Sequence, residues 1–402
     1  MKSVHCPPLL LTLGILLSTA GCGGGGGSSA SNNPPVVTPA QNVQTIVVDS
    51  GPANTTNLVF TNVTICAPGN GANCQTIDHI LIDTGSSGLR VMSSVLAPSL
   101  SLHQQADLNG FPIVECAQFV DGFAWGPVKL ADVRIAGEQA NSVPIQIIGD
   151  PGFSSVPNAC SSTGPAENTV QTFGANGILG VGVFLQDCGP ACASSSTYGF
   201  YYSCPASGCQ PAIVGIAQQV QNPVAMFATD NNGVVLALPS VPPAGSATVT
   251  GSMIFGIGTQ TNNLLGGATV FTVDPNTGYL TTLYNNRTYF DSFIDSGSTV
   301  IFFPNGNTPV CTGPGGGLYC PSSTQNFSAT IQGIDRASAP VSFSVANADS
   351  LFNANPGFAA FSNLAAPNSD AFSFAWGLPF FYGRTVYTAF EGQTTTGPYI
   401  AF

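Results

Sequence analysis

The sequence predicts an all-β protein with few short helices. Gly and Pro account for 47 and 31 of the 402 residues, 44% of the chain is hydrophobic and only 6% is charged. Such a composition suits many short strands joined by turns, and it is too apolar for a disordered chain. Apolar and polar residues alternate with period two in several segments, which is typical of half-buried strands. These segments are 128–130, 133–135, 341–345 and 372–376.

Helical periodicity is scarce. The best candidate for a short helix is 212–220, and 93–96 is a weaker candidate for a single turn. Neither is long enough to change the fold class.

The N-terminus has the features of an export signal over residues 1–21. A basic Lys2 precedes a short apolar core at 9–17, and the small residues 18–21 lead directly to Cys22. This arrangement resembles the signal of bacterial lipoproteins, in which the cysteine is lipidated after cleavage. Thr19 departs from that pattern, where an apolar residue is usual, so simple secretion is the alternative.

The remaining chain divides into a tether and two halves. Residues 22–43 form a tether rich in Gly, Ser and Pro. We expect an N-terminal lobe at 44–240 and a C-terminal lobe at 241–402, with the boundary in the proline-rich stretch 239–243. No segment after the signal is long and apolar enough for a transmembrane helix.

The charge balance excludes some partners. The formal net charge is −12, and removal of Lys2 with the signal makes it one unit more negative. A surface this acidic does not favour nucleic acid or anionic lipid as a partner. Contact with a membrane is therefore expected only through the lipid on Cys22.

Ten of the 12 cysteines remain when Cys6 and Cys22 are set aside. An even number in an exported protein predicts disulfides. We expect Cys66 to pair with Cys74 and Cys311 with Cys320, because each pair closes a short loop. For the other six the pairing stays open.

A zinc site is the alternative for four of these cysteines. Their spacing would allow a four-thiolate site, although an oxidising compartment favours disulfides. The four are Cys188, Cys192, Cys204 and Cys209. Only His79 and His103 remain as histidines after the signal, so we expect no other metal site and no cofactor.

The most informative feature is a motif that occurs twice. An apolar run ends in Asp83-Thr84-Gly85-Ser86, and a second run ends in Asp295-Ser296-Gly297-Ser298, 212 positions later. Either motif alone would be an ordinary turn, in which the Asp side chain hydrogen-bonds to the backbone and Gly adopts the positive φ that the turn needs. Two copies, each after an apolar strand, indicate one carboxylate from each half of a duplicated protein.

Two carboxylates held close together can share one proton, because like charges a few ångströms apart do not both ionise. The ionised member can take a proton from water while the protonated member donates to a carbonyl oxygen. Asp83 and Asp295 are therefore the candidate catalytic residues. Hydroxyl and glycine groups in the same loops can support them; these are Thr84, Gly85, Ser86, Ser296, Gly297 and Ser298.

Further segments, in the same order and spacing, resemble the pepsin-like aspartic proteases. The resemblance covers about residues 44–402 and implies a bilobed fold with the active-site cleft between the lobes. The matching segments are 177–180, beneath the first loop; 252–256, opening the second lobe; and 376–381 with 387–391, near the end of the chain.

The resemblance also places a substrate-covering flap, with departures. Phe119 falls where the family usually has Tyr, and Gly122 falls near the tip of the hairpin. Arg90 stands where the family has the Trp that partners that Tyr, and Leu378 replaces a usual Asp. Between Cys22 and about Thr45 there is linker rather than the basic propeptide of the secreted zymogens.

These features favour a monomeric, lipid-anchored aspartic endopeptidase of the bacterial cell envelope, acting on peptide or protein substrates through Asp83 and Asp295. The alternative is a non-catalytic lipoprotein that uses the same fold to bind peptide, glycan or a protein partner. The two intact Asp motifs favour the enzyme, whereas the altered flap favours the binder.

Overall fold

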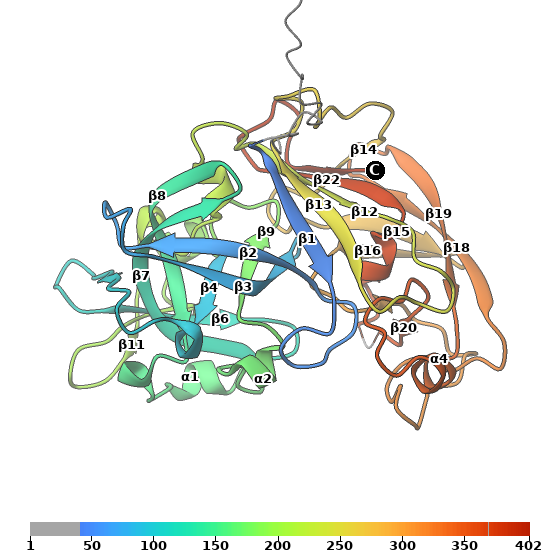
Figure 1. Cartoon of the computed structure of the whole chain (residues 1–402), viewed down its shortest axis with the longest axis horizontal. Helices are drawn as coiled ribbons and strands as arrows, with labels where there is room; N and C mark the ends of the chain where they lie inside the picture. The colour runs from blue at the N-terminus through green and yellow to red at the C-terminus, as the bar shows by residue number, and fades with distance from the viewer. Residues whose placement is uncertain (1–40, 369) are drawn as a thin grey trace, which may run out of the picture. The chain divides into compact units, whose positions relative to one another are not determined.

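The computed structural model describes residues 41–368 and 370–402 (Figure 1). The predicted signal, Cys22 and the tether as far as residue 40 lie outside the described residues. The described residues belong to one compact unit. Their structure is mainly β, and the longest α-helix has seven residues, so the predicted fold class is confirmed.

The first sheet has 16 strands, and its order runs from β11 at one edge to β14 at the other. Its central pairing joins β1 to β13, which lie side by side in blue and yellow in Figure 1. The strands are β1 Val43–Val48, β2 Val59–Cys66, β3 Cys74–Asp83, β4 Ser87–Met92, β5 His103–Gln104, β6 Ile113–Gln118, β7 Phe123–Ile135, β8 Glu138–Ile148, β9 Gly177–Val181, β10 Tyr201–Ser203, β11 Gln210–Pro211, β12 Gly233–Leu238, β13 Val249–Phe255, β14 Val270–Thr272, β22 Arg384–Ala389 and β23 Tyr399–Ala401.

The second sheet has seven strands, all from the C-terminal part of the chain. They are β15 Leu280–Tyr284, β16 Arg287–Ile294, β17 Ile301–Phe302, β18 Gln325–Gln332, β19 Ser338–Val345, β20 Ala365–Ala366 and β21 Ala375–Trp376. The α-helices are α1 Asn158–Ser161, α2 Val170–Phe173, α3 Pro190–Ser194 and α4 Ala348–Ala354. The 3-10 helices are η1 Ser93–Val95, η2 Pro151–Phe153, η3 Ile216–Gln218, η4 Pro223–Met226 and η5 Leu378–Phe380.

Most of the predicted strands are present. The segments 128–130 and 133–135 lie in β7, 341–345 lies in β19, and the predicted turn at 93–96 is η1. Only the last two residues of 372–376 form a strand. No helix in the described residues is both long enough and apolar enough to cross a lipid bilayer.

The helix predicted at 212–220 is wrong apart from the single 3-10 turn η3. Pro211 directly precedes this segment and Gly215 lies within it, and Gly disfavours a continuous helix. The buried residues Val214 and Val220 instead pack in a small cluster with Tyr201. Tertiary packing therefore decides the conformation here.

The same arrangement of three strands occurs in each half. In the first half β9 pairs parallel with β3, opposite Asp83, and antiparallel with β4. In the second half β21 pairs parallel with β16 and antiparallel with β17. Both Asp motifs therefore follow a strand that is braced by a later segment of its own half. The lobe boundary at 240/241 stays a prediction; residues 239–243 lie in the loop between β12 and β13.

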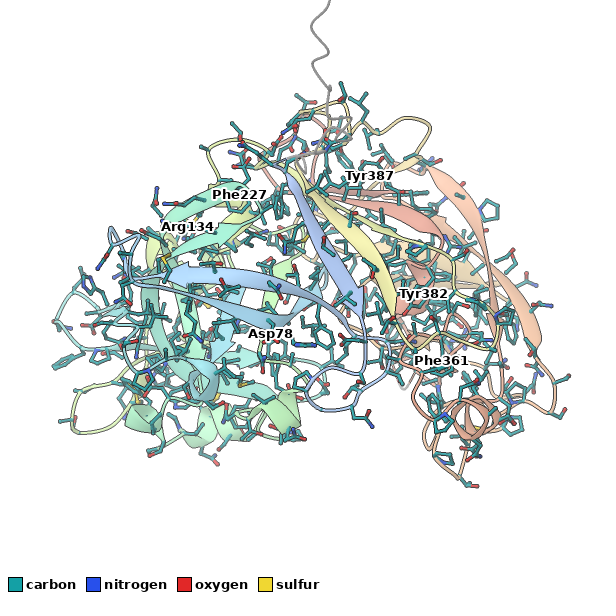
Figure 2. The ribbon with its side chains drawn as sticks, viewed as in Figure 1. Asp78, Arg134, Phe227, Phe361, Tyr382 and Tyr387 are labelled. Atoms are coloured by element: carbon teal, nitrogen blue, oxygen red, sulfur yellow. A yellow bond between two sulfur atoms is a disulfide. The ribbon has the colours of Figure 1, made fainter. Side chains whose placement is uncertain are left out.

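One buried asparagine ties the N-terminal part of the chain to the loop that follows the second motif. Asn57 is fully buried, and its amide donates to the carbonyl oxygens of Thr299 and Phe361, each at 2.9 Å. Its side-chain oxygen accepts from the Phe361 amide and the Tyr382 hydroxyl. Phe361 and Tyr382 are labelled in Figure 2. These four bonds satisfy every polar atom of the Asn57 side chain.

The ten cysteines of the described chain form five disulfides. The two predicted pairs, Cys66–Cys74 and Cys311–Cys320, are confirmed. The other three bonds are Cys116–Cys160, Cys188–Cys192 and Cys204–Cys209. No thiolate is therefore left among the four candidate zinc ligands.

We expect the Cys116–Cys160 bond to contribute most to stability. It spans 44 positions, whereas Cys188–Cys192 spans four. Loop-closure entropy predicts that replacing both cysteines of the long loop by Ala lowers the free energy of unfolding by about 4 kcal/mol. The same replacement in the short loop should lower it by about 2 kcal/mol. Urea denaturation of the two double variants measures the difference; an equal loss would contradict the prediction.

Candidate active site

The two Asp motifs form loops with the same hydrogen bonds. Asp83 is the last residue of β3, and its carboxylate accepts from the Gly85 amide at 2.7 Å and from the Ser86 hydroxyl. Asp295 directly follows β16, and its carboxylate accepts from the Gly297 amide at 2.8 Å and the Ser298 hydroxyl at 2.6 Å. Each carboxylate is thus held by donors two and three residues further on.

The two loops are joined by reciprocal hydrogen bonds. The Thr84 hydroxyl donates to the Ile294 carbonyl at 3.1 Å and accepts from the Ser296 amide at 3.0 Å. The Ser296 hydroxyl donates to the Ile82 carbonyl at 2.8 Å and accepts from the Thr84 amide at 3.1 Å. Both side chains are buried, so these four bonds fix one loop against the other away from water.

Glycine is required because each loop approaches the carboxylate of the other. A Cβ on Gly85 would lie 2.8 Å from Cγ of Asp295, and a Cβ on Gly297 would lie 2.7 Å from Oδ1 of Asp83. Both distances are shorter than a van der Waals contact, and the obstruction is a carboxylate that is already held in place. The structure therefore brings Asp83 and Asp295 together, as the duplicated motif predicts.

The electrostatics of this pair favour a retained proton. Burial raises the pKa of Asp83 well above its usual value, and the negative charge of Asp295 and a hydrogen bond with it raise it further. The hydrogen bonds from Ser86 and Gly85 act in the opposite direction but do not cancel these effects. One carboxyl group of the pair is thus held protonated where an isolated Asp would be ionised.

Glycines also allow the bracing segments to reach the loops. Gly180 of β9 pairs with both Asp83 and Gly88, and a Cβ there would lie 2.7 Å from the Ser87 nitrogen. In the second half the Asp295 amide donates to the Trp376 carbonyl at 2.9 Å. The sequence segments expected beneath the two loops are found there.

The predicted flap corresponds to the β6–β7 hairpin. Phe119 and Gly122 close its turn, where the Phe119 amide donates to the Gly122 carbonyl at 2.8 Å, and Val120 at the tip is fully exposed. The Phe119 ring packs edge-on against Phe173 at 5.8 Å. On its outer side the hairpin is extended by β10 and β11, which sequence reasoning did not anticipate.

Arg90 has a role that the sequence did not reveal. It is 2% exposed and lies in an ion-pair network with Glu115 and Asp187, at 2.6 and 3.2 Å. Its guanidinium carbon lies 5.9 Å from the centre of the Phe119 ring. The sequence identified Arg90 only as a replacement for Trp, because its partners are 25 and 97 positions away.

Within the described residues, three potential metal ligands come within 4.8 Å of one another only at Cys311, Cys320 and Asp349. The two cysteines form a disulfide, so this group offers a single carboxylate. Each Asp carboxylate accepts from one backbone amide and one hydroxyl, which leaves acceptor sites free for a water. The arrangement suits proton transfer to and from a bound water better than metal binding.

The fold is similar to that of the aspartic proteinase from Irpex lacteus, whose crystal structure superimposes with a TM-score of 0.51 and 14% sequence identity. The similarity covers 89% of this chain and 96% of that one. The chain therefore has the mainly β, bilobed fold of the pepsin-like aspartic proteinases. By sequence the chain belongs to the family described as "Protein of unknown function (DUF3443)", which matches residues 38–402. No curated protein matches the sequence.

The reciprocal hydrogen bonds can be tested without any assumption about activity. We expect Thr84→Val and Ser296→Ala each to lower the free energy of unfolding by about 1–3 kcal/mol, because each leaves a buried amide and carbonyl without a partner. Thr64→Val is the matched control, since its hydroxyl pairs with Thr76 at an exposed position. Chemical denaturation should show a change within about 0.5 kcal/mol for the control; equal losses in all three would contradict the prediction.

Proposed function

We propose that the chain is an aspartic endopeptidase in which Asp83 and Asp295 activate one water molecule for attack on a peptide bond. The observation that carries this proposal is the pair of loops that exchange hydrogen bonds and place each Asp against the glycine of the other loop. Support also comes from the raised pKa of Asp83, since the chemistry needs one protonated and one ionised carboxyl.

In the proposed reaction Asp83 holds the proton of the pair and Asp295 is ionised. Asp295 takes a proton from the water as its oxygen attacks the carbonyl carbon, and Asp83 donates its proton to the carbonyl oxygen. Collapse of the tetrahedral intermediate returns that proton to Asp83, while the proton held by Asp295 passes to the leaving nitrogen. Amide and hydroxyl donors from the loops keep both carboxylates oriented throughout.

The substrate in this proposal is an extended peptide covered by the β6–β7 hairpin. Between Phe119 and Gly122 the hairpin turn exposes Val120 and Asp121, and Val120 offers an apolar contact. Main-chain pairing with a hairpin recognises the extended backbone of a substrate rather than one side chain. We propose a monomer that acts on peptide or protein substrates without a cofactor.

We propose further that the enzyme is exported and held at the bacterial cell envelope by a lipid on Cys22. Five disulfides are consistent with an exported protein, because such bonds persist in oxidising compartments. The small residues before Cys22 and the Gly-rich tether behind it support the anchor.

Asp83→Asn and Asp295→Asn should each reduce cleavage of a peptide library by at least about 10³-fold, and the double variant should lose little more, since the pair acts as a unit. Activity should be greatest in acid and fall once both carboxyls ionise. Digests at several pH values, with and without a statine-type inhibitor, measure this. Near-normal turnover in either single variant would reject the assignment. Peptide binding without cleavage by the wild type would favour the non-catalytic alternative.

Lipid anchoring is tested by Cys22→Ser. The variant should move the mature protein from the membrane fraction to a soluble fraction, because the tether alone has no affinity for a bilayer. Mass spectrometry of the wild-type N-terminus should find an acylated Cys22. An unmodified N-terminus at any other residue would contradict the anchor.

A further inference from the structure

A buried ion-pair network lies between the Asp83 loop and the β6–β7 hairpin. The guanidinium of Arg90, on β4, donates to both carboxylate oxygens of Glu115, on β6, at 2.6 and 3.3 Å. Glu115 is fully buried and Arg90 is 2% exposed. The bidentate geometry fixes the direction of the guanidinium as well as its distance.

A third segment completes the network. Asp187 lies between β9 and β10; it accepts from Arg90 at 3.2 Å and from the Tyr201 hydroxyl at 2.6 Å. That hydroxyl in turn accepts from the Val220 amide at 2.8 Å. Tyr201 is on β10, the strand that covers the outer edge of the hairpin. The network therefore holds the hairpin and its added strand to β4.

The remaining guanidinium nitrogen points to the candidate catalytic loop. Nη1 of Arg90 donates to the Ser87 carbonyl at 3.0 Å. Ser87 is the neighbour of Ser86, whose hydroxyl donates to the Asp83 carboxylate. Arg90 is thus connected to Asp83 through a hydrogen bond to Ser87, the peptide link to Ser86 and the hydrogen bond from Ser86 to the carboxylate. The guanidinium of Arg90 also lies over the Phe119 ring of the hairpin turn.

We propose that Arg90 is a positioning residue that couples the β6–β7 hairpin to the Asp83 loop, so that the hairpin and the carboxylate keep one relative geometry. The proposal rests on the proposed function for its effect on cleavage, but the coupling itself does not.

The energetics favour this role over a purely stabilising one. Removing charged groups from water costs more than their attraction commonly returns, and apolar replacements of buried ion pairs are often more stable. Here the charges join three segments at separations of 25 and 97 positions and leave no guanidinium nitrogen unused. A fixed geometry is what such a network supplies.

The network contains one cation and two carboxyl groups, so its charge depends on one proton. Burial raises the pKa of Glu115 well above its usual value; the Arg90 charge opposes this, and the Asp187 charge and a hydrogen bond with Asp187 add to it. In the described chain the titratable groups that face Glu115 are Arg90, Asp187 and Tyr201. With Glu115 protonated, Arg90 and Asp187 balance each other.

The test variant is Arg90→Leu combined with Asp187→Asn. It removes one positive and one negative charge together, so that no charged neighbour of Glu115 is left unpaired and the fold should survive. The matched control is Lys129→Met with Asp150→Asn. That pair is joined at 2.8 Å and links β7 to the segment after β8, and among the described residues neither side chain hydrogen-bonds to the Asp83 loop.

Hydrogen exchange measured by mass spectrometry is the readout that does not need activity. The test variant should exchange about tenfold faster or more at both 86–89 and 119–122, while the control changes neither. Faster exchange at 119–122 alone would overturn the proposal, because Arg90 would then only stabilise the hairpin. Unchanged exchange at both would also overturn it.

Kinetics give the second readout. The test variant should lower kcat about ten- to hundredfold with a smaller change in KM, since misplacement affects the reacting groups more than the peptide contacts. An unchanged kcat would overturn the proposal. If the wild type cleaves no peptide but the exchange result holds, the proposed function fails and the coupling stands.

Protonation gives the third readout. Because the pKa of Glu115 is raised, Glu115 stays protonated below that pKa and the network has no net charge. As the pH rises through that pKa, Glu115 ionises and this neutral arrangement is lost. Exchange at 86–89, corrected for its intrinsic pH dependence, should therefore accelerate with rising pH in the wild type. Glu115→Gln keeps the shape and should remove this pH dependence. Retention of the same dependence in Glu115→Gln would overturn the role given to the network.

Discussion

The four reciprocal hydrogen bonds of Thr84 and Ser296 are the constraint on which the rest of the site depends. Each of these residues uses both its backbone amide and its hydroxyl to reach the opposite loop. Asp83 and Asp295 directly precede Thr84 and Ser296 in the sequence. The distance between the two carboxylates therefore follows from these bonds. The glycines at 85 and 297 then permit an approach that any Cβ would prevent.

Although the loops are alike, their surroundings differ. Around Asp295 the support is aromatic: Trp376 stacks on Phe374 at 4.5 Å between ring centres and meets Phe343 edge-on at 5.5 Å. Leu378, where the resemblance would place an Asp, is fully buried in η5. Around Asp83 the support is ionic, through Arg90. The loop of the second half is therefore held by packing, which is insensitive to pH, whereas the loop of the first half depends in addition on charges that respond to pH.

Local patterns in the sequence predicted the parts of the fold that depend on local physics. The two Asp motifs, the Gly180 segment and two of the short disulfides, Cys66–Cys74 and Cys311–Cys320, are recognisable because strand alternation, turn chemistry and small loops each have a sequence signature. The Cys116–Cys160 bond has none, and neither does the addition of β10 to the hairpin. Partners such as Glu115 and Asp187 are ordinary acidic residues until the fold brings them to Arg90. The segment 212–220 does not form the expected helix, because apolar spacing alone does not distinguish a helix from residues that pack in a cluster with Tyr201.

The duplication also has a consequence for how the protein is made. The hydrogen bonds that fix the two Asp loops against each other join residues separated by 210 to 214 positions in the sequence. Asn57 bonds to partners 304 and 325 positions away. Contacts at such separation form late, because a long loop must close first. During synthesis the first half can complete β3, β4 and β9 while Thr84 has no partner. The carboxylates can therefore pair only after Ser296 has left the ribosome, and a chain truncated before Asp295 carries a single, isolated Asp loop.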